Sequence, residues 1–335
     1  MNRRLSGTAV LLIALVVLTI GALVYSRPSA AISASGLDPV LDAGQVRIMA
    51  PAKPGGGWDQ TARAMQAALV PILGRTEVYN VGGAGGTIGL AQYQQLAGQP
   101  NELMVMGAIM VGAIETNESR YGLDSVNPIA RLLTEYQVIV VPAASPITSI
   151  EQLAEAIRAD VGAVSFAGGS AGGVEQVLAG KLAKALGANP RQVSYVAHSG
   201  GGEALSTVLS GRAKAGLSGV AEIKPYIESG DVRALAVSSP QRLASLPDVP
   251  TLIEKGIDVE VENWRGVAAP AGLNPDQLAA VTRMIRQMTE TEEWRSLLEE
   301  RGWEAAYLDG SAFVDFVGTD VEKTRQTLRE IGLIS

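Results

Sequence analysis

Runs of apolar residues alternate with amphipathic segments along most of the chain from residue 46 onward. The segments between the runs have the apolar spacing of helices, as at residues 61–73, 88–96 and 174–186. Alternation of this kind predicts an α/β fold with a doubly wound parallel sheet. We therefore expect strands at residues 46–50, 77–81, 103–106, 137–141, 163–167, 193–197, 213–217 and 232–237.

The alternation is interrupted at a Pro-rich stretch, residues 142–146, and then starts again. We place a crossing between two domains at this break. Residues 137–141, just before it, are continuously apolar, which is typical of a buried parallel strand. A helix with Ser149 as its N-cap is expected after the break. Residues 264–270 should form a strand that leads back to the first domain, and residues 274–332 should be mostly helical.

Glycine-rich loops follow several of the expected strands. Glycine lets the main chain approach a ligand closely, and the free N–H groups of a following helix favour an anion. Because ligands of open α/β sheets bind at strand ends, two facing sheets would form a cleft lined with N–H donors. Asp59, Glu203 and Glu222 lie near expected helix starts, where capping is the usual role, and we expect Asp59 to cap the first helix. The loops lie within residues 51–63, 82–87, 168–173 and 198–202.

The N-terminus has two arginines before an apolar run, residues 9–25, and a small-residue site at residues 29–31. This order is typical of an export signal in residues 1–31. The apolar run is close to the minimum length of a membrane span, so an uncleaved N-terminal anchor is the alternative. Residues 32–44 predict a linker. The chain has no cysteine, which excludes a disulfide and a thiolate metal site.

The formal net charge is −7, although residues 1–31 carry three arginines and no acid. The remainder is therefore more acidic than the whole chain and has no basic stripe, which argues against a nucleic-acid partner. An anionic ligand would need local positive potential from backbone N–H groups. With one histidine, His198, and no cysteine, we expect no transition-metal site.

Three enzyme motifs bear on the glycine-rich loops. The loop at residues 83–88 lacks the third glycine of the dinucleotide pattern, and no phosphate-binding Gly-Lys-Ser/Thr loop exists, so no cofactor is expected. Residues 168–172 match the Gly-x-Ser-x-Gly nucleophile elbow, so an exported serine hydrolase using Ser170 is one alternative. The only histidine of the chain is His198, and the only acid between Ser170 and His198 is Glu175. This order does not fit a hydrolase triad. We therefore expect no enzyme activity, and a hydrogen-bonding role for Ser170.

Several motifs, in this order, resemble signatures of the solute-binding receptors of tripartite tricarboxylate transporters. The first signature is similar to residues 51–63, PAKPGGGWDQTAR, and the second to residues 81–89, VGGAGGTIG. Later signatures resemble residues 199–204, SGGGEA, 246–252, LPDVPTL, and 264–270, WRGVAAP. The resemblance covers nearly all of the chain after the signal. Each motif alone is a Gly- or Pro-rich turn, and the specificity comes from the set.

The resemblance implies a two-lobed periplasmic binding protein of the Venus flytrap kind, type II-like, with each lobe a mainly parallel sheet flanked by helices. Lobe 1 would comprise residues 45–143 and 258–335, and lobe 2 residues 144–257. The protein would be periplasmic and monomeric. It would capture a small carboxylate, such as a di- or tricarboxylate or a related organic acid, and deliver it to the membrane permease subunits of a secondary transporter. A sensor subunit that presents its ligand to a membrane kinase is a further alternative.

The resemblance also implies which residues meet the ligand. Such receptors hold carboxylates through loop N–H groups, small hydroxyls and ordered waters. Selectivity among acids would depend on the length of the cavity and on side chains such as Trp58, His198 and Met110. The implied ligand-binding residues are Gly56, Gly57, Trp58, Asp59, Gly85, Gly86 and Thr87 from lobe 1, and Ser170, Ala171, Gly173, His198, Ser199 and Gly200 from lobe 2.

Overall fold

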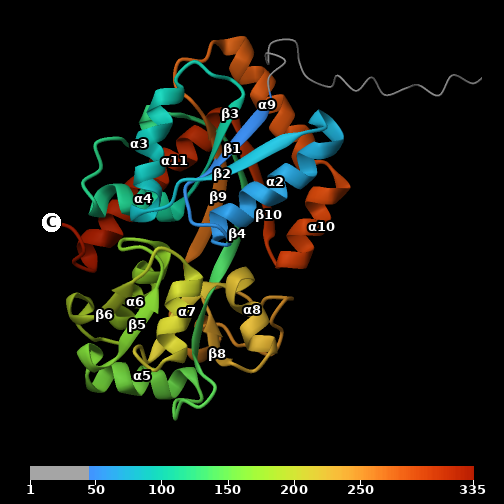
Figure 1. Cartoon of the computed structure of the whole chain (residues 1–335). Helices are drawn as coiled ribbons and strands as arrows, with labels where there is room; N and C mark the ends of the chain where they lie inside the picture. The colour runs from blue at the N-terminus through green and yellow to red at the C-terminus, as the bar shows by residue number, and fades with distance from the viewer. Residues whose placement is uncertain (1–44) are drawn as a thin grey trace, which may run out of the picture. The chain divides into compact units, whose positions relative to one another are not determined.

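A computed structural model of the chain describes residues 45–335. The expected signal or anchor and the expected linker lie outside these described residues. The described part is an α/β structure of two lobes, drawn above and below one another in Figure 1. Their sheets are joined through one long strand, β4 (Asn127–Pro142).

Lobe 1 is built on a mixed sheet. Its first three strands, β1 (Val46–Ala50), β2 (Thr76–Asn80) and β3 (Glu102–Gly107), are parallel, as the alternation of strands and helices predicts. The strands β9 (Glu262–Ala269) and β10 (Glu304–Asp309) run antiparallel to their neighbours. The helices of this lobe are α2 (Gly57–Leu73), α3 (Thr87–Tyr93), α4 (Ala108–Thr116), α9 (Pro275–Thr289), α10 (Glu292–Arg301) and α11 (Gly310–Glu330).

Lobe 2 repeats the arrangement with shorter strands. β5 (Ser165–Gly168) pairs in parallel with β6 (Ser194–Ala197) and with β7 (Ala215–Gly219). The edge strand β8 (Val232–Val237) pairs antiparallel with β4. Its helices are α5 (Ile150–Ala159), α6 (Val174–Ala185), α7 (Gly201–Leu209) and α8 (Val220–Glu228).

Strand β4 corrects two expectations. Residues 137–141 form a buried strand, but it is antiparallel to β7 and β8 rather than parallel. Its apolar run is continuous because both faces are covered: Val138 and Val140 pack into one core cluster, and Ile139 and Val141 into another. The crossing is also earlier than residues 142–146, since β4 pairs with β9 up to Tyr136 and with β7 from Gln137. The division of the chain at residue 143 stays a prediction.

Each lobe has its own hydrophobic core. In lobe 1 the largest buried cluster packs α2, α4, α9 and α11 against the sheet, with Trp264 in edge contact with Phe313 at 5.8 Å between ring centroids. In lobe 2, α5 contributes Ile150 and Leu153 from one face, as its helical spacing requires. Separate cores allow the lobes to be rigid units on either side of the cavity described below.

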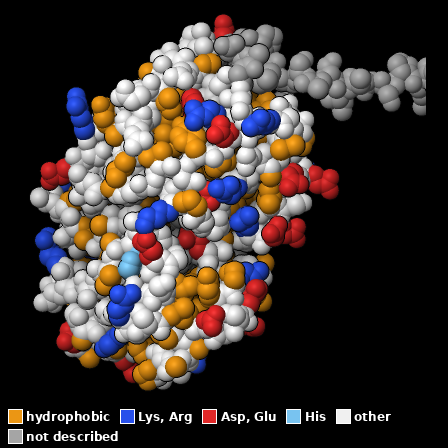
Figure 2. Space-filling view, in the orientation of Figure 1, with side chains coloured by type: hydrophobic (Ala, Val, Ile, Leu, Met, Phe, Trp, Pro, Cys, Tyr) orange, Lys and Arg blue, Asp and Glu red, His pale blue; other side chains and the backbone are white. Residues whose placement is uncertain are grey.

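Two surface properties bear on function. Within residues 45–335, no helix is both long and apolar enough to span a membrane. The face shown in Figure 2 carries acidic and basic side chains interspersed, rather than a continuous basic stripe. This distribution agrees with the charge pattern of the sequence.

Candidate functional site

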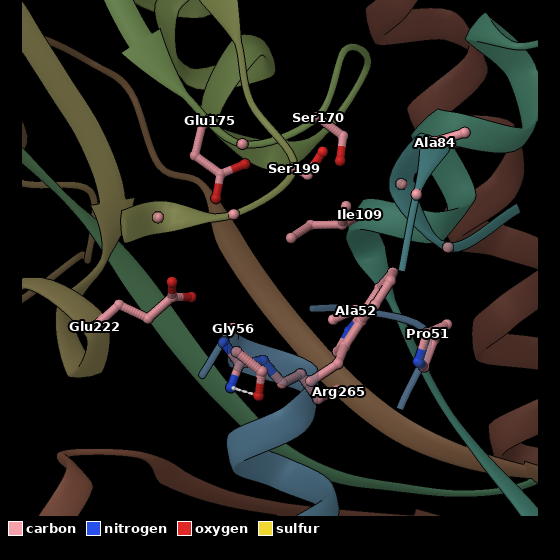
Figure 3. A pocket seen from close by; sticks show the side chains of 18 residues that line it. Pro51, Ala52, Gly56, Ala84, Ile109, Ser170, Glu175, Ser199, Glu222 and Arg265 are labelled. Atoms are coloured by element: carbon pink, nitrogen blue, oxygen red, sulfur yellow. Dashed lines mark hydrogen bonds between the residues drawn. The ribbon is translucent and has the colours of Figure 1, made fainter. Parts of the chain in front are cut away.

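A cavity of about 60 Å³ lies where the two lobes meet. Loops from both lobes line it, which brings together the four glycine-rich segments that are far apart in the sequence (Figure 3). Four residues from other elements complete the wall: Ile109 of α4, Glu175 of α6, Glu222 of α8 and Arg265 of β9. The lining residues are Pro51, Ala52, Gly56, Gly57, Trp58, Gly83, Ala84, Gly85, Gly86, Ile109, Gly169, Ser170, Glu175, Ser199, Gly200, Gly201, Glu222 and Arg265.

The helices that begin beside the cavity have glycine N-caps. The caps of α2, α6 and α7 are Gly56, Gly173 and Gly200, and none makes a side-chain capping hydrogen bond. Helices α5, α9 and α10 are instead capped by the side chains of Ser149, Asn274 and Thr291, so the Ser149 prediction is confirmed. A helix start with a glycine N-cap directs its first N–H groups and the positive end of its dipole at an anion, and in α2 and α7 the Gly57 and Gly201 N–H groups already meet the Glu222 carboxylate. The cavity is therefore suited to a carboxylate.

Most of the expected site residues line this cavity. They are Gly56, Gly57, Trp58, Gly85, Gly86, Ser170, Ser199 and Gly200. Trp58 is 5% exposed, and its Nε1 has no hydrogen-bond partner among the described residues. Gly86 requires the left-handed conformation, with φ 89°, and a Cβ there would lie 2.6 Å from the Trp58 ring. Met110 packs behind Gly86 and does not line the cavity.

The other expected residues lie beside the cavity rather than on its wall. Ala171 and His198 line an adjoining surface hollow together with Ser170. The Gly173 N–H donates to Ser170 O at 3.0 Å, and the Thr87 hydroxyl donates to Ala84 O at 2.9 Å, so both are used in shaping their loops. Their roles in binding, and that of Asp59, remain predictions.

Asp59 is not the N-cap of α2, which corrects the sequence-based expectation. Helix α2 begins at Gly57, so Asp59 falls within its first turn. Its carboxylate accepts hydrogen bonds from Gly55 N–H at 2.8 Å, in the preceding loop. It also accepts from Asn80 Nδ2 at 2.9 Å and from Arg63 Nε at 2.9 Å. Burial raises the pKa of Asp59, but these hydrogen bonds hold it below its usual value. Asp59 therefore fixes the shape of the first glycine-rich loop.

The sequence did not single out the charged residues of the wall as ligand contacts. Sequence patterns give Glu222 a capping role, place Glu175 in the helix after the nucleophile-elbow motif, and place Arg265 within a strand motif. Glu203 lies in the first turn of α7, and its carboxylate accepts from Ser199 N–H at 3.1 Å, one residue before the N-cap Gly200. A signal existed for Arg265, because charged residues are rare inside strands that are otherwise apolar.

Arg265 is held in a buried network beneath the cavity. Its Nη2 forms an ion pair with Glu135, and its Nη1 donates to Gly57 O at 3.0 Å and Thr61 Oγ1 at 3.1 Å. The Glu135 carboxylate also accepts from Asn263 Nδ2 at 2.9 Å and Trp303 Nε1 at 3.1 Å. The arginine side chain is 2% exposed and that of the glutamate 1%. This network ties β4 and β9 to the start of α2.

Glu175 and Glu222 face the cavity from lobe 2. Desolvation raises the pKa of Glu175 to about 8, and the charges of Glu222 and Glu135 add to the effect. Desolvation likewise raises the pKa of Glu222 to about 7, against the opposing charge of Arg265 and N–H groups of Gly201 and Gly57. Glu175 is 6% exposed, while Glu222 keeps intermediate exposure because its carboxylate borders the cavity. Both carboxyls therefore titrate near neutral pH in the free protein.

We expect the Glu175→Gln variant to gain stability relative to wild type as the pH rises from 6 to 8. The folded wild type keeps a proton on Glu175 that the unfolded chain releases, so its unfolding free energy falls with rising pH in this window. The difference in unfolding free energy between Glu175→Gln and wild type should change by about 1 kcal/mol per pH unit. Urea titrations at several pH values measure it. Glu254→Gln, at an exposed pair with Arg242, is the control. An unchanged difference would contradict the raised pKa.

The lobes touch each other around the cavity. The Thr116 hydroxyl of α4 donates to Ala171 O at 3.3 Å, and Lys53 forms an ion pair with Glu203 across the opening. Gly112 of α4 lies directly against Gly172 O, where a Cβ would overlap the oxygen. At the end of α11, Glu330 pairs with Lys184 of α6 at 2.7 Å. These contacts describe a closed arrangement of the lobes.

The hydrolase alternative gains no support from the geometry. Among residues 45–335, no hydrogen bond joins the Ser170 hydroxyl to His198. The histidine Nε2 is buried without a partner, and its backbone N–H donates to Gly168 O at 3.1 Å. Within the same residues, no group of three Asp, Glu, His or Cys side chains is arranged to hold a metal ion.

Comparison with known proteins identifies relatives of the whole domain. Residues 61–333 match the sequence model of a family described as "Tripartite tricarboxylate transporter family receptor". The chain is 25% identical to BugT of Bordetella pertussis over 293 residues, which cover 86% of this chain and 89% of BugT.

Solved structures share the fold. The periplasmic binding protein BugD is similar with a TM-score of 0.78 and 24% identity, over 87% of this chain and 98% of BugD. MatC from Rhodopseudomonas palustris, solved with bound malate, has a TM-score of 0.74 and 21% identity, over 85% of this chain and 98% of MatC. These similarities confirm the two-lobed fold of a periplasmic binding protein and the resemblance read from the motifs.

Proposed function

We propose, from the premise that the chain belongs to the family of tripartite tricarboxylate transporter receptors, that it captures a small organic acid between its lobes and delivers it to a transporter. The protein would act in the periplasm and would present the closed, loaded form to the membrane subunits. It would bind its ligand without changing it chemically.

One observation carries this proposal: three helices with glycine N-caps, α2, α6 and α7, begin around a single cavity between the lobes. The Gly57 and Gly201 N–H groups already donate to Glu222, so the remaining N–H groups of these helix starts, with the hydroxyls of Ser170 and Ser199, would donate to a ligand carboxylate without a dedicated cation. Hydrogen bonds to a charged group contribute about 1.5–3 kcal/mol each, so four to six of them would outweigh the ordering cost of closure. Micromolar or tighter binding would follow. The malate bound to MatC, a protein of the same fold, agrees with this ligand class.

Titration calorimetry against a panel of small mono-, di- and tricarboxylates and amino acids tests the proposal. We expect at least one acid to bind with a dissociation constant in the micromolar range or below, and to raise the melting temperature. No heat and no thermal shift with any member of the panel would refute it.

The same preparation tests for hydrolysis. Turnover of short-chain esters that Ser170→Ala abolishes would replace receptor function with catalysis, and we expect none. Delivery to a transporter is tested by co-purification with the membrane subunits in the presence of the bound acid. Failure of the loaded protein to associate with them would leave binding intact but refute the transport role.

A further inference from the structure

Glu222 caps two helices that belong to different lobes. Its carboxylate accepts from the N–H groups of Gly57, the first residue of α2 in lobe 1, and of Gly201, the first residue of α7 in lobe 2. Glu222 itself lies in the first turn of a third helix, α8. Two helix N-termini, each with the positive end of its dipole, therefore meet on one carboxyl group of the protein.

Two glycines allow this contact. A Cβ on Gly57 would lie 2.9 Å from Glu222 Oε1, and a Cβ on Gly201 would overlap Oε2. The carboxyl group thus lies between two main chains, with one oxygen against each helix start. Figure 3 shows the side chain extending from lobe 2 toward the space between the lobes, with Gly56, the N-cap of α2, on the other side. Because Gly57 and Glu222 belong to different lobes, separation of the lobes breaks their contact.

The closed arrangement surrounds Glu222 with groups that favour its neutral form. Desolvation has the largest effect on this carboxyl, and the charge of Glu135 from β4 adds to it, against the opposing charge of Arg265 from β9 and the two N–H groups. The other carboxyl that faces it is Glu175 from α6. The pKa of Glu222 is therefore raised to about 7. Once Gly57 moves away and water reaches the carboxyl, its pKa should return toward the ordinary value of about 4.3.

We propose that Glu222 is a proton-linked latch, which holds the lobes together through the starts of α2 and α7 and takes up a proton when the lobes close. The neutral carboxyl keeps an oxygen that accepts from a helix start, and it avoids the cost of burying a charge. Closure is therefore favoured at low pH and weakened as the pH rises through 7. This inference rests on the proposed function, since it concerns how the cavity of the receptor is opened and closed.

Glu175 also lines the cavity, but it should not respond to closure in this way. Its side chain is 6% exposed and packs against its own lobe, where a Cβ on Gly169 or Gly173 would lie 3.0 or 3.2 Å from its Oε2. Tyr195, the tyrosine next to it, belongs to the same lobe. Because these surroundings move together with Glu175, its proton should stay in place whether the lobes are open or closed.

Distances between the lobes in the ligand-free protein test the latch. The chain has no cysteine, so Ile88→Cys in lobe 1 and Val196→Cys in lobe 2 provide two sites for spin labels. Both residues are exposed, at 45% and 38%. Pulsed electron paramagnetic resonance then gives the ratio of closed to open protein. A group with a pKa of about 7 is mostly neutral at pH 6 and mostly ionised at pH 8.5, so we expect this ratio to fall about tenfold between the two values.

Three substitutions in the labelled protein assign the effect to Glu222. Glu222→Gln keeps the size of the side chain and an acceptor oxygen but cannot ionise, so its ratio at pH 6 and at pH 8.5 should agree within about twofold. Glu222→Ala removes the latch and should lower the ratio at pH 6 about tenfold or more. Glu175→Gln, the control for a second carboxyl in the same cavity, should keep the tenfold change of the wild type.

The outcomes separate the latch from the function on which it rests. An equal ratio at the two pH values in the wild type would overturn the latch. A tenfold change that Glu222→Gln retains, or that Glu175→Gln abolishes, would overturn it equally. Each of these results leaves the receptor function standing, because the measurement uses no ligand. Failure of the whole acid panel would instead refute the receptor function, while the tenfold change in the ligand-free protein would still support the latch.

Discussion

Replacing Gly112 with alanine should weaken ligand binding about 100-fold or more while leaving the free protein at least as stable as wild type. Gly112 lies inside helix α4, where alanine is favoured over glycine by roughly 0.5–1 kcal/mol. A Cβ at this position would overlap Gly172 O, a backbone atom of lobe 2 that cannot rotate away. The substitution therefore strengthens one lobe and obstructs only the closed arrangement. Apparent affinity falls in proportion to the fraction of protein able to close.

A matched control isolates the effect of closure. Gly318 lies inside helix α11, and a Cβ there would meet nothing within 4 Å. Gly318→Ala should raise stability by a similar amount without changing affinity. Calorimetry and thermal unfolding compare the two variants, and small-angle X-ray scattering with saturating ligand reports whether the lobes close. If Gly112→Ala bound as wild type and gave the same compact scattering profile, the contact with Gly172 would not govern closure.

Closure explains why loops far apart in the sequence form one site. The N–H groups of α2 belong to lobe 1 and those of α6 and α7 to lobe 2, so neither lobe alone surrounds a ligand. Hinge motion about the connecting segments would open the cavity to solvent. Because β4 is continuous through the change of pairing partner, bending between Tyr136 and Gln137 is constrained by strand pairing on both sides. The chain therefore passes from one sheet to the other at this change of pairing partner rather than at the proline-rich stretch.

Local features of the sequence predicted much of the fold. The β1, β6 and β8 strands and the Ser149 cap follow from apolar runs and capping chemistry, which depend on neighbouring residues only. The antiparallel pairing of β4 did not follow, because an apolar run reports that both faces are buried and not the direction of the neighbour. Strand β10 was missed, since its six residues lie between two long helices and carry no strong alternation.

The site was only partly predictable, because the sequence shows local features and not tertiary packing. Glycine loops mark where the backbone can approach a ligand, and most of those expected residues line the cavity. The capping prediction for Asp59 is wrong because the helix begins at Gly57, three residues before the start that an N-cap at Asp59 requires. Glu175 and Glu222 could not be assigned, because an acid near a helix start looks the same whether it caps the helix or faces a cavity. Only tertiary packing distinguishes the two.

Replacing Arg265 with methionine should lower the free energy of unfolding by about 3–5 kcal/mol. The loss does not come mainly from the missing attraction. It comes from leaving Glu135 buried, 1% exposed, without its cation, while Gly57 O and Thr61 Oγ1 lose their donor. Arg242 and Glu254 form an exposed pair of the same type. Changing Arg242 to methionine should lower the free energy of unfolding by less than about 1 kcal/mol.

The second substitution in the same network tests this explanation. Glu135→Gln removes the stranded charge and keeps an acceptor for Asn263 Nδ2, so the double variant with Arg265→Met should recover about 1–3 kcal/mol over the single variant. Urea unfolding at pH 7 measures the free energy of unfolding of each protein. The proteins are the wild type, both single variants, the double variant and Arg242→Met. If the double variant were no more stable than Arg265→Met alone, the buried charge would not be the source of the loss. A loss from Arg265→Met as small as that from Arg242→Met would show that the network is not needed to hold α2 against β4 and β9.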